Sequence, residues 1–141
     1  MKTDQLETPL QVNIMTKPKA FVSLMKLRLS SLVVLSAFFG FLMAKGDLNS
    51  LSMYSLLFGG LLITGSSNGF NQILEIKTDT LMSRTKSRPL PVQIISKIEA
   101  IIFCAIIGTL GLFLLYTINY KSMLLGLFSI IVYVLIYTPL K

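Results

Sequence analysis

Residues 68–91 read NGFNQILEIKTDTLMSRTKSRPLP and separate two long apolar runs of the chain. The run that leads into them carries no charged residue between positions 48 and 74. If the helix formed by this run continues past residue 74, a rotation of about 100° per residue brings several polar side chains within roughly ±60° of one line. These side chains are Asn68, Asn71, Gln72, Glu75 and Asp79, with Met82 at the end of the row. The stretch therefore predicts a polar face at the end of a membrane helix.

Four stretches of the 141-residue chain lack charged residues, namely 29–44, 48–74, 100–120 and 122–140. A membrane-spanning helix needs about 20 apolar residues, and a chain with 53% hydrophobic and 13% charged residues is too apolar for an ordinary soluble domain. The first stretch is short, but it extends to about residue 22 if Lys26 and Arg28 snorkel to the interface. We expect an all-α fold, a polytopic membrane helical bundle with transmembrane helices at about 22–44, 50–74, 97–118 and 122–138. Residues 1–19 would form a polar cytoplasmic tail, and residues 20–141 one membrane domain.

The basic residues alternate along the chain. Five precede the first apolar run, at positions 2, 17, 19, 26 and 28, and five lie between the second and third, at 77, 84, 86, 88 and 97. The positive-inside rule then places the N-terminus and the 75–97 loop in the cytoplasm. The net charge of +7 thus reports topology first and attraction to anionic membrane lipid second. Nucleic-acid binding is not expected, because the charge is spread along two rims beside the membrane.

The missing residue types exclude several kinds of chemistry. The chain contains no histidine and a single cysteine, Cys104. Histidine-dependent triads and histidine-ligated zinc or haem are therefore excluded within these residues. Cys104 lies in an apolar run and is expected to be a buried small hydrophobe. The first residues resemble neither a transit peptide nor a short signal sequence, so the plasma (inner) membrane of a bacterium is the location that fits best.

The polar face and the cations that follow it favour a site for a phosphorylated substrate. Carboxylate and amide oxygens are ligands for a hard divalent metal, and the arginines beside Lys86 bind phosphate bidentately. The alternative for Glu75 and Asp79 is a solvated helix end. For Arg84, Lys86 and Arg88, as for Lys26 and Arg28, the alternative is the positive-inside signal itself.

Local signals place the neighbouring elements. Pro89 and Pro91 predict a shaped loop after the basic residues. Ser96 and Glu99 form a capping box that starts the third long helix near Lys97. The second run is rich in small residues towards its end, which predicts close packing against another helix, or alternatively room for a bulky ligand.

The central stretch resembles the first aspartate-rich motif of the UbiA-type intramembrane prenyltransferases. The residues that carry the resemblance are Asn68-x-x-Asn71-Gln72-x-x-Glu75-x-x-x-Asp79-x-x-Met82-x-Arg84-Thr85-x-x-Arg88-Pro89-Leu90-Pro91. Within that superfamily, Gln72, Glu75 and the Arg-Pro-Leu-Pro ending are most similar to the protohaem IX farnesyltransferases, the haem O synthases. Lys26-Leu27-Arg28 looks like the family's Lys-Pro-Arg, with leucine in place of proline. The ending Tyr137-Thr138-Pro139-Leu140-Lys141 resembles the family's segment after the fourth span, so the match runs from about residue 17 to the end.

The resemblance implies about nine helices around a cavity open to the cytoplasm, and transfer of farnesyl from farnesyl diphosphate to haem B. By position, Asn71, Glu75 and Asp79 would be the catalytic residues and hold Mg²⁺. The diphosphate would be bound by Asn68, Arg84, Lys86 and Arg88, with Lys26 and Arg28 as further candidates. The family's second acidic motif is missing, so we expect these residues to be an incomplete portion that is inactive alone and needs a C-terminal half or a partner chain. A quinone-precursor prenyltransferase and a non-catalytic four-helix membrane protein are the alternatives.

Overall fold

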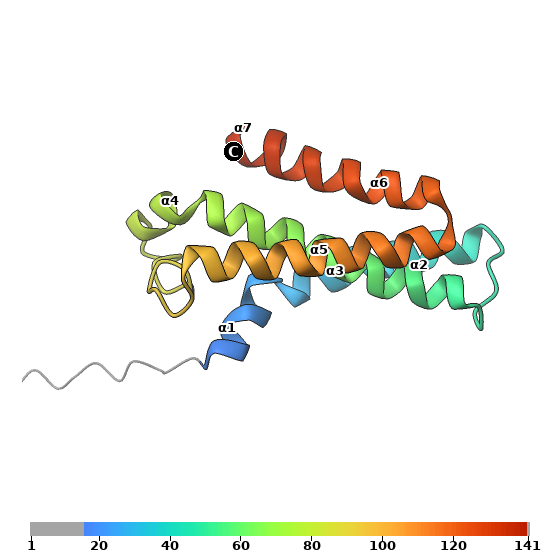
Figure 1. Ribbon diagram of the computed structural model, residues 1–141, viewed down its shortest axis with the longest axis horizontal. Helices are drawn as coiled ribbons and strands as arrows, with labels where there is room; N and C mark the ends of the chain where they lie inside the picture. Colours follow the sequence, from blue (N-terminus) through green and yellow to red (C-terminus); the bar gives the residue numbers. More distant parts are fainter. Residues whose placement is uncertain (1–15, 141) are drawn as a thin grey trace, which may run out of the picture.

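The computed structural model describes residues 16–140, and these form helices and connecting turns with no strand (Figure 1). The elements are α1 (Lys17–Leu24), α2 (Leu27–Met43), α3 (Leu51–Leu74), α4 (Ile76–Leu81), α5 (Lys97–Ile118), α6 (Tyr120–Ile131), the π-helical turn η1 (Val132–Tyr137) and α7 (Thr138–Leu140). The predicted all-α fold is confirmed. Residues 1–15 of the expected tail, and Lys141, lie outside the described residues, whereas residues 17–19 form the first turn of α1.

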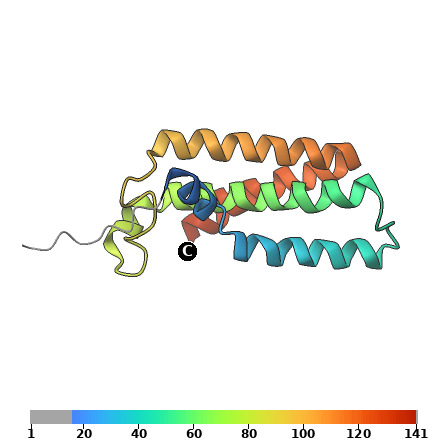
Figure 2. The ribbon, with the colours of Figure 1, turned by 90° about the horizontal axis from the view of Figure 1, so that it is seen from below.

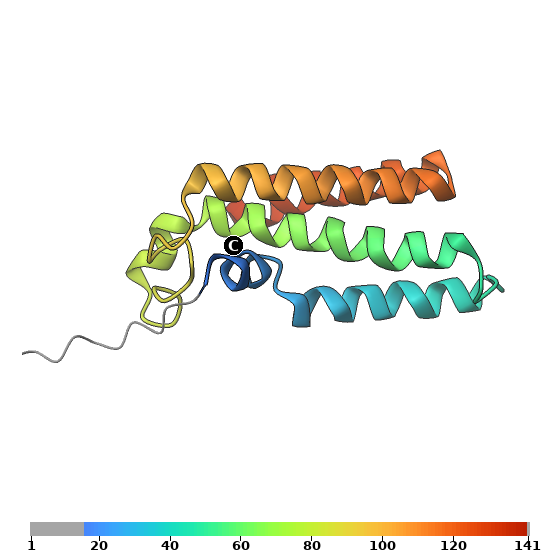
Figure 3. The same ribbon diagram turned by 60° about the horizontal axis from the view of Figure 1, so that its bottom comes forward.

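Helix α3 is the centre of the bundle. It lies between α2 and α5, and α6 runs behind α3 and α5 (Figures 2 and 3). Its packing against α5 depends on glycine, because a Cβ added at Gly111 would lie 3.0 Å from the carbonyl oxygen of Gly59, and one at Gly59 would lie 3.2 Å from that of Gly111. Ser66 adds a hydrogen bond from its hydroxyl to the Cys104 carbonyl, at 2.8 Å. The prediction that small residues serve close helix packing holds at this interface.

The membrane-spanning character of the helices is uneven. Among the described residues, two segments are long and apolar enough to cross a bilayer, Lys97–Ile118 and Tyr120–Leu140, and a third is obtained if the bent pair α1–α2 is one span. Helix α3 has 24 residues, but the Ser, Gly, Asn and Gln residues of its second half lower its hydropathy. These residues face neighbouring helices and are buried, so they do not need to be apolar. That the predicted second span at 50–74, which forms α3, crosses the membrane stays a prediction.

The predicted first span is not one continuous helix, and this corrects the expectation for residues 22–44. Helices α1 and α2 meet at an angle of 45°, and Lys26 between them adopts a left-handed conformation with φ 47°. The break frees carbonyl groups at the end of α1, which need partners where water is excluded. Gln72 Nε2 donates to the Leu24 carbonyl at 3.1 Å, while the Met25 carbonyl accepts from the Ser30 hydroxyl at 2.7 Å and from Asn68 Nδ2 at 3.3 Å. Side chains from α3 therefore stabilise the break.

Side-chain caps begin α3 and α5. Ser50 accepts a hydrogen bond from the Met53 N–H at 3.2 Å and is the N-cap of α3. The capping box of α5 is complete, with both the Ser96 and the Glu99 bonds present. Helix α5 covers Lys97–Ile118, the range expected from sequence.

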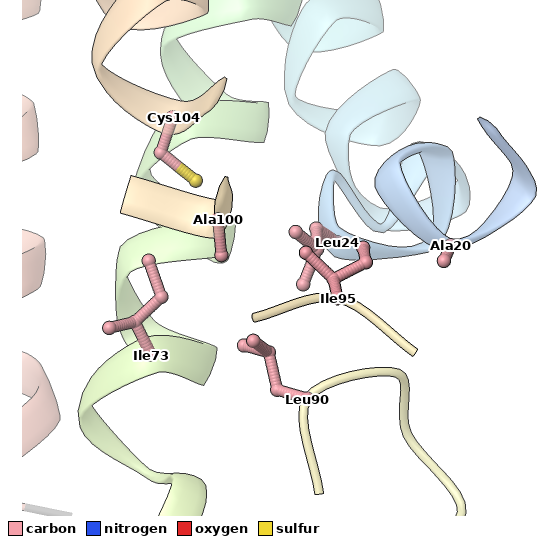
Figure 4. Close-up of a cluster of buried hydrophobic side chains, with 7 residues drawn as sticks. All are labelled: Ala20, Leu24, Ile73, Leu90, Ile95, Ala100 and Cys104. Carbon is pink, nitrogen blue, oxygen red and sulfur yellow. The ribbon is translucent and has the colours of Figure 1, made fainter. Parts of the chain in front are cut away.

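An apolar cluster holds the elements around the polar end of the bundle (Figure 4). It joins α1, the end of α3, the 82–96 connection and the start of α5, through Ala20, Leu24, Ile73, Leu90, Ile95, Ala100 and Cys104. Cys104 is fully buried, as predicted. Outside the cluster, the Lys17 ammonium forms an ion pair with the Glu99 carboxylate at 2.9 Å. The connection that carries the predicted cations is thereby anchored on three helices.

Candidate functional site

A cavity of about 540 Å³ lies where α3 ends, between α4, the turn that follows α4, and α7. It is lined by Leu74, Glu75, Thr78, Asp79, Met82, Arg84, Thr85, Arg88, Thr138 and Pro139. Four of the predicted site residues are in this set, two acidic and two basic. The cavity therefore brings carboxylates and guanidinium groups to one polar surface, as the sequence pattern indicated.

The helix that carries the acidic residues is interrupted, which corrects the continuous polar face expected from residue 68 to residue 82. Helix α3 ends at Leu74, and Glu75 has φ −92° and ψ 8°. The residues that follow include β-branched Ile76, Thr78 and Thr80, which favour a helix less than unbranched residues do. The Asp79 N–H still donates to the Glu75 carbonyl at 2.8 Å, so both acidic side chains remain on the cavity.

Asp79 is the most buried charged group of the site. Only 4% of the residue is exposed, and its Oδ2 lies 2.8 Å from Arg88 Nη1. The Thr85 hydroxyl also donates to the Asp79 carbonyl oxygen, at 3.0 Å. A buried carboxylate needs such a counter-charge, and Pro89, which is itself buried, holds the backbone next to Arg88. Asp79 and Arg88 thus form a pre-positioned ion pair on the cavity wall.

Asn71 is fully buried and connects two parts of the site. Its Nδ2 donates to Glu75 Oε2 at 2.9 Å, and its Oδ1 accepts from the Thr138 hydroxyl at 2.8 Å. Both ends of the amide are engaged, so its orientation is defined. Asn71 therefore links Glu75 to the segment that follows α6.

The other two amides of the predicted face have a different position. Gln72 and Asn68 turn towards α1 and donate to its terminal carbonyls. Asn68 lines a separate cavity of about 500 Å³, with Leu29, Val33, Thr64, Ser67, Ser129, Tyr133 and Tyr137. The reason is the break before Lys26, which presents unpaired carbonyls that sequence periodicity alone does not reveal. Neither amide is on the wall of the cavity that contains Glu75.

The predicted cations are divided by the structure. Arg84 and Arg88 line the cavity of Glu75, with Arg84 exposed and Arg88 half-buried. Lys86 is exposed on the same turn but does not line the cavity. Lys26 and Arg28, at the break between α1 and α2, line neither of the two cavities. Their proposed contact with diphosphate stays a prediction.

Two residues of the site were not among the predicted ones. Thr138 lines the cavity and reaches Asn71, while the Tyr133 hydroxyl donates to Asn68 Oδ1 at 3.3 Å. Thr138 lies in the ending that resembles the family's segment after the fourth span, but no local feature of the sequence indicates its contact or that of Tyr133. Their partners are 65 and 67 positions away in the chain, which is why helical spacing within residues 68–91 does not identify them.

Comparison with known proteins identifies the family of the chain. Residues 33–141 match the UbiA prenyltransferase family. The chain belongs to that family. No solved structure matches it.

The relatives of this UbiA-family chain include proteins named protoheme IX farnesyltransferase. The protein of that name from Christiangramia forsetii is 41% identical over 121 residues, which are 86% of this chain and 40% of the relative. The one from Cytophaga hutchinsonii is 43% identical over 127 residues, 87% of this chain and 44% of the relative. The chain thus spans less than half the length of the curated relatives it matches.

The donor groups of this UbiA-family chain suit one kind of metal. Within residues 16–140, no three His, Cys, Asp or Glu side chains come together as ligands of an ion. The cavity offers the carboxylates of Glu75 and Asp79, with the Asn71 amide behind them. Mg²⁺ usually takes one or two carboxylates and completes its coordination with water and substrate phosphates. The donor set of this cavity is compatible with Mg²⁺.

Proposed function

We propose that the chain contributes one wall of the active site of a membrane enzyme that transfers farnesyl from farnesyl diphosphate to haem B, giving haem O. The observation that carries the proposal is the cavity in which Glu75 and Asp79 lie beside Arg84 and Arg88. The relatives named protoheme IX farnesyltransferase supply the acceptor. In this proposal the N-terminus and the 75–97 loop face the cytoplasm of a bacterial inner membrane, and the remaining walls come from a C-terminal half or a partner chain.

The residues of the cavity have separate roles in the proposed reaction. When bound, Mg²⁺ would supply positive charge for the diphosphate, which leaves with the electron pair of the broken C–O bond. Glu75 and Asp79 would hold this ion, with Asn71 as a neutral oxygen donor. Arg84 and Arg88 would bind the leaving diphosphate, because guanidinium groups make charge-assisted bonds to phosphate oxygens. The ion pair at Asp79 keeps Arg88 at the cavity wall before substrate arrives.

A binding experiment tests the site directly. The full chain, purified into lipid nanodiscs, is titrated with radiolabelled farnesyl diphosphate in Mg²⁺ and in EDTA. We expect weak binding that requires Mg²⁺ and falls about tenfold in Asp79→Asn and in Arg84→Ala, the effect of losing one charge-assisted contact. Asp47→Asn, in the α2–α3 connection at the other end of the bundle, is the matched control and should bind as the wild type does. Binding that is insensitive to EDTA and to these substitutions would refute the proposed site.

The acceptor is tested by completing the protein. Residues 1–141 are joined to the portion of the Cytophaga hutchinsonii relative that the chain does not cover, and membranes are supplied with haem B or hydroxybenzoate. Formation of haem O supports the proposal, and prenylated hydroxybenzoate would instead assign a quinone pathway. Absence of both products, with no Mg²⁺-dependent binding, would favour a non-catalytic membrane protein. Farnesyl transfer by the 141-residue chain alone would contradict the requirement for further protein.

A further inference from the structure

The long C-terminal segment changes its helical register just before it reaches the site. Residues Val132–Tyr137 form a π-helical turn between α6 and α7, and the Thr138 N–H donates to the Tyr133 carbonyl, five residues earlier. Pro139 supplies a local cause, because its ring excludes the α-helical bond to residue 135 and clashes with that carbonyl. Such turns are rare and are found frequently at functional sites.

The π-helical turn carries two hydroxyl groups that both reach α3. Residues five apart in an α-helix point about 140° away from each other, at about 100° per residue, whereas an i→i+5 turn places them on the same side. Here the Tyr133 hydroxyl reaches Asn68 Oδ1 and the Thr138 hydroxyl reaches Asn71 Oδ1, at 3.3 and 2.8 Å. The turn thus directs both donors to the amide oxygens of α3.

The Thr138 hydroxyl has a second acceptor. Its oxygen lies 3.1 Å from the Tyr133 carbonyl as well as 2.8 Å from Asn71 Oδ1, and it has one proton to donate. When the Thr138 hydroxyl donates to Asn71 Oδ1, the Asn71 amide is fixed with its Nδ2 towards Glu75. With the proton on the Tyr133 carbonyl, the lone pairs of Asn71 Oδ1 become available to a cation, and the hydroxyl keeps a hydrogen bond.

We propose that Thr138, placed by the π-helical turn, is a positioning residue that sets the orientation of the Asn71 amide and releases its oxygen when a divalent cation binds with diphosphate. The cation part rests on the proposed function. The orientation of Asn71 without ligand does not. Thr138 acts through Asn71 and makes no contact with the reacting carbon.

Three variants separate the hydroxyl from the shape of the side chain and from the turn. Thr138→Val removes the hydroxyl at nearly constant volume, Thr138→Ser retains it, and Pro139→Ala removes the local cause of the π-helical turn while it leaves Thr138 in place. Thr109→Val is the matched control, since the Thr109 hydroxyl donates to the Ala105 carbonyl within α5, on an exposed face. Circular dichroism and thermal unfolding verify that each variant is folded.

The first measurement needs no ligand. The chain is labelled with ¹⁵N-asparagine in nanodiscs, and the side-chain amide signal of Asn71 is assigned by its loss in Asn71→Asp. We expect this signal to shift and to exchange faster with water in Thr138→Val and in Pro139→Ala, and to stay unchanged in Thr138→Ser and Thr109→Val. An Asn71 signal that is the same in Thr138→Val as in the wild type would overturn the proposal. Should Thr138→Val fail to fold, Pro139→Ala gives the same decision.

The second measurement uses Mn²⁺ with inorganic diphosphate, followed by electron paramagnetic resonance. Loss of one hydrogen bond that orients a ligand predicts Mn²⁺ binding about fivefold weaker in Thr138→Val, with wild-type binding in Thr138→Ser. Equal weakening in the serine variant would overturn the role of the hydroxyl. If the wild type binds no Mn²⁺ with diphosphate, the proposed function fails, and the Asn71 signal still decides the orientation.

Discussion

Replacement of Gln72 distinguishes a structural cap from a metal ligand. Its Nε2 donates to the Leu24 carbonyl at 3.1 Å, and Gln72 and Leu24 are 3% and 0% exposed. Gln72→Leu keeps most of the side-chain volume, so the main change is a buried carbonyl without its donor. Such a group costs about 1–3 kcal/mol, and we expect a loss of about 2 kcal/mol in the free energy of unfolding, a factor of about 30 in the folded-to-unfolded ratio.

Equilibrium unfolding in detergent, followed by circular dichroism, measures this loss. Hydrogen exchange of the α1 amides adds a local readout, since α1 should open first when its terminal carbonyl is unpaired. The control is Thr109→Val, which removes a side-chain bond to a carbonyl on the exposed face of α5 and should change the stability by less than about 0.5 kcal/mol.

Gln72→Glu sharpens the distinction. A carboxylate on the metal-binding face would tighten Mn²⁺ binding, whereas a carboxylate that faces the Leu24 carbonyl would be destabilising because two acceptors then oppose each other. We expect destabilisation without tighter Mn²⁺ binding. Two results would refute the role of Gln72 as a cap of the Leu24 carbonyl. One is a Gln72→Leu variant whose free energy of unfolding lies within about 0.5 kcal/mol of the wild type, and the other is tighter Mn²⁺ binding in Gln72→Glu.

Three further predictions use the same unfolding measurement. Arg88→Met leaves the buried Asp79 carboxylate without a counter-charge and should lower the free energy of unfolding by about 2 kcal/mol. This is less than the loss on breaking a fully buried ion pair, because the Arg88 side chain is 28% exposed. An unchanged stability would contradict the ion pair. Gly111→Ala places a Cβ 3.0 Å from a backbone carbonyl of α3 and should cost about 1–3 kcal/mol, whereas Gly40→Ala meets nothing within 4 Å and should be neutral or stabilising; equal effects would argue against close packing. Lys17→Ala removes the 2.9 Å ion pair between α1 and Glu99 of α5 and should leave the stability close to that of the wild type, because both side chains are exposed; a large loss would show that the pair is more than a surface contact.

Local chemistry in the sequence predicted the bundle and the end at which its site lies. The capping box at Ser96 and Glu99 and the range of α5 were predictable because a helix start depends on bonds between residues three apart. Glu75, Asp79, Arg84 and Arg88 were predictable as neighbours because all lie within one short polar stretch between apolar runs. Hydropathy and short-range hydrogen bonding carry that information without any knowledge of partners.

The tertiary structure alone decided how that polar stretch is used. The carbonyls at the break before Lys26 accept hydrogen bonds from amides that lie 43 and 48 positions further along the chain. Helical spacing therefore could not assign Gln72 to a carbonyl of α1. Thr138 reaches Asn71 across 67 positions, through a π-helical turn that apolar periodicity does not show. A buried amide bonds to whichever group the packed helices bring within about 3 Å, and that choice depends on helices whose arrangement is absent from any local pattern.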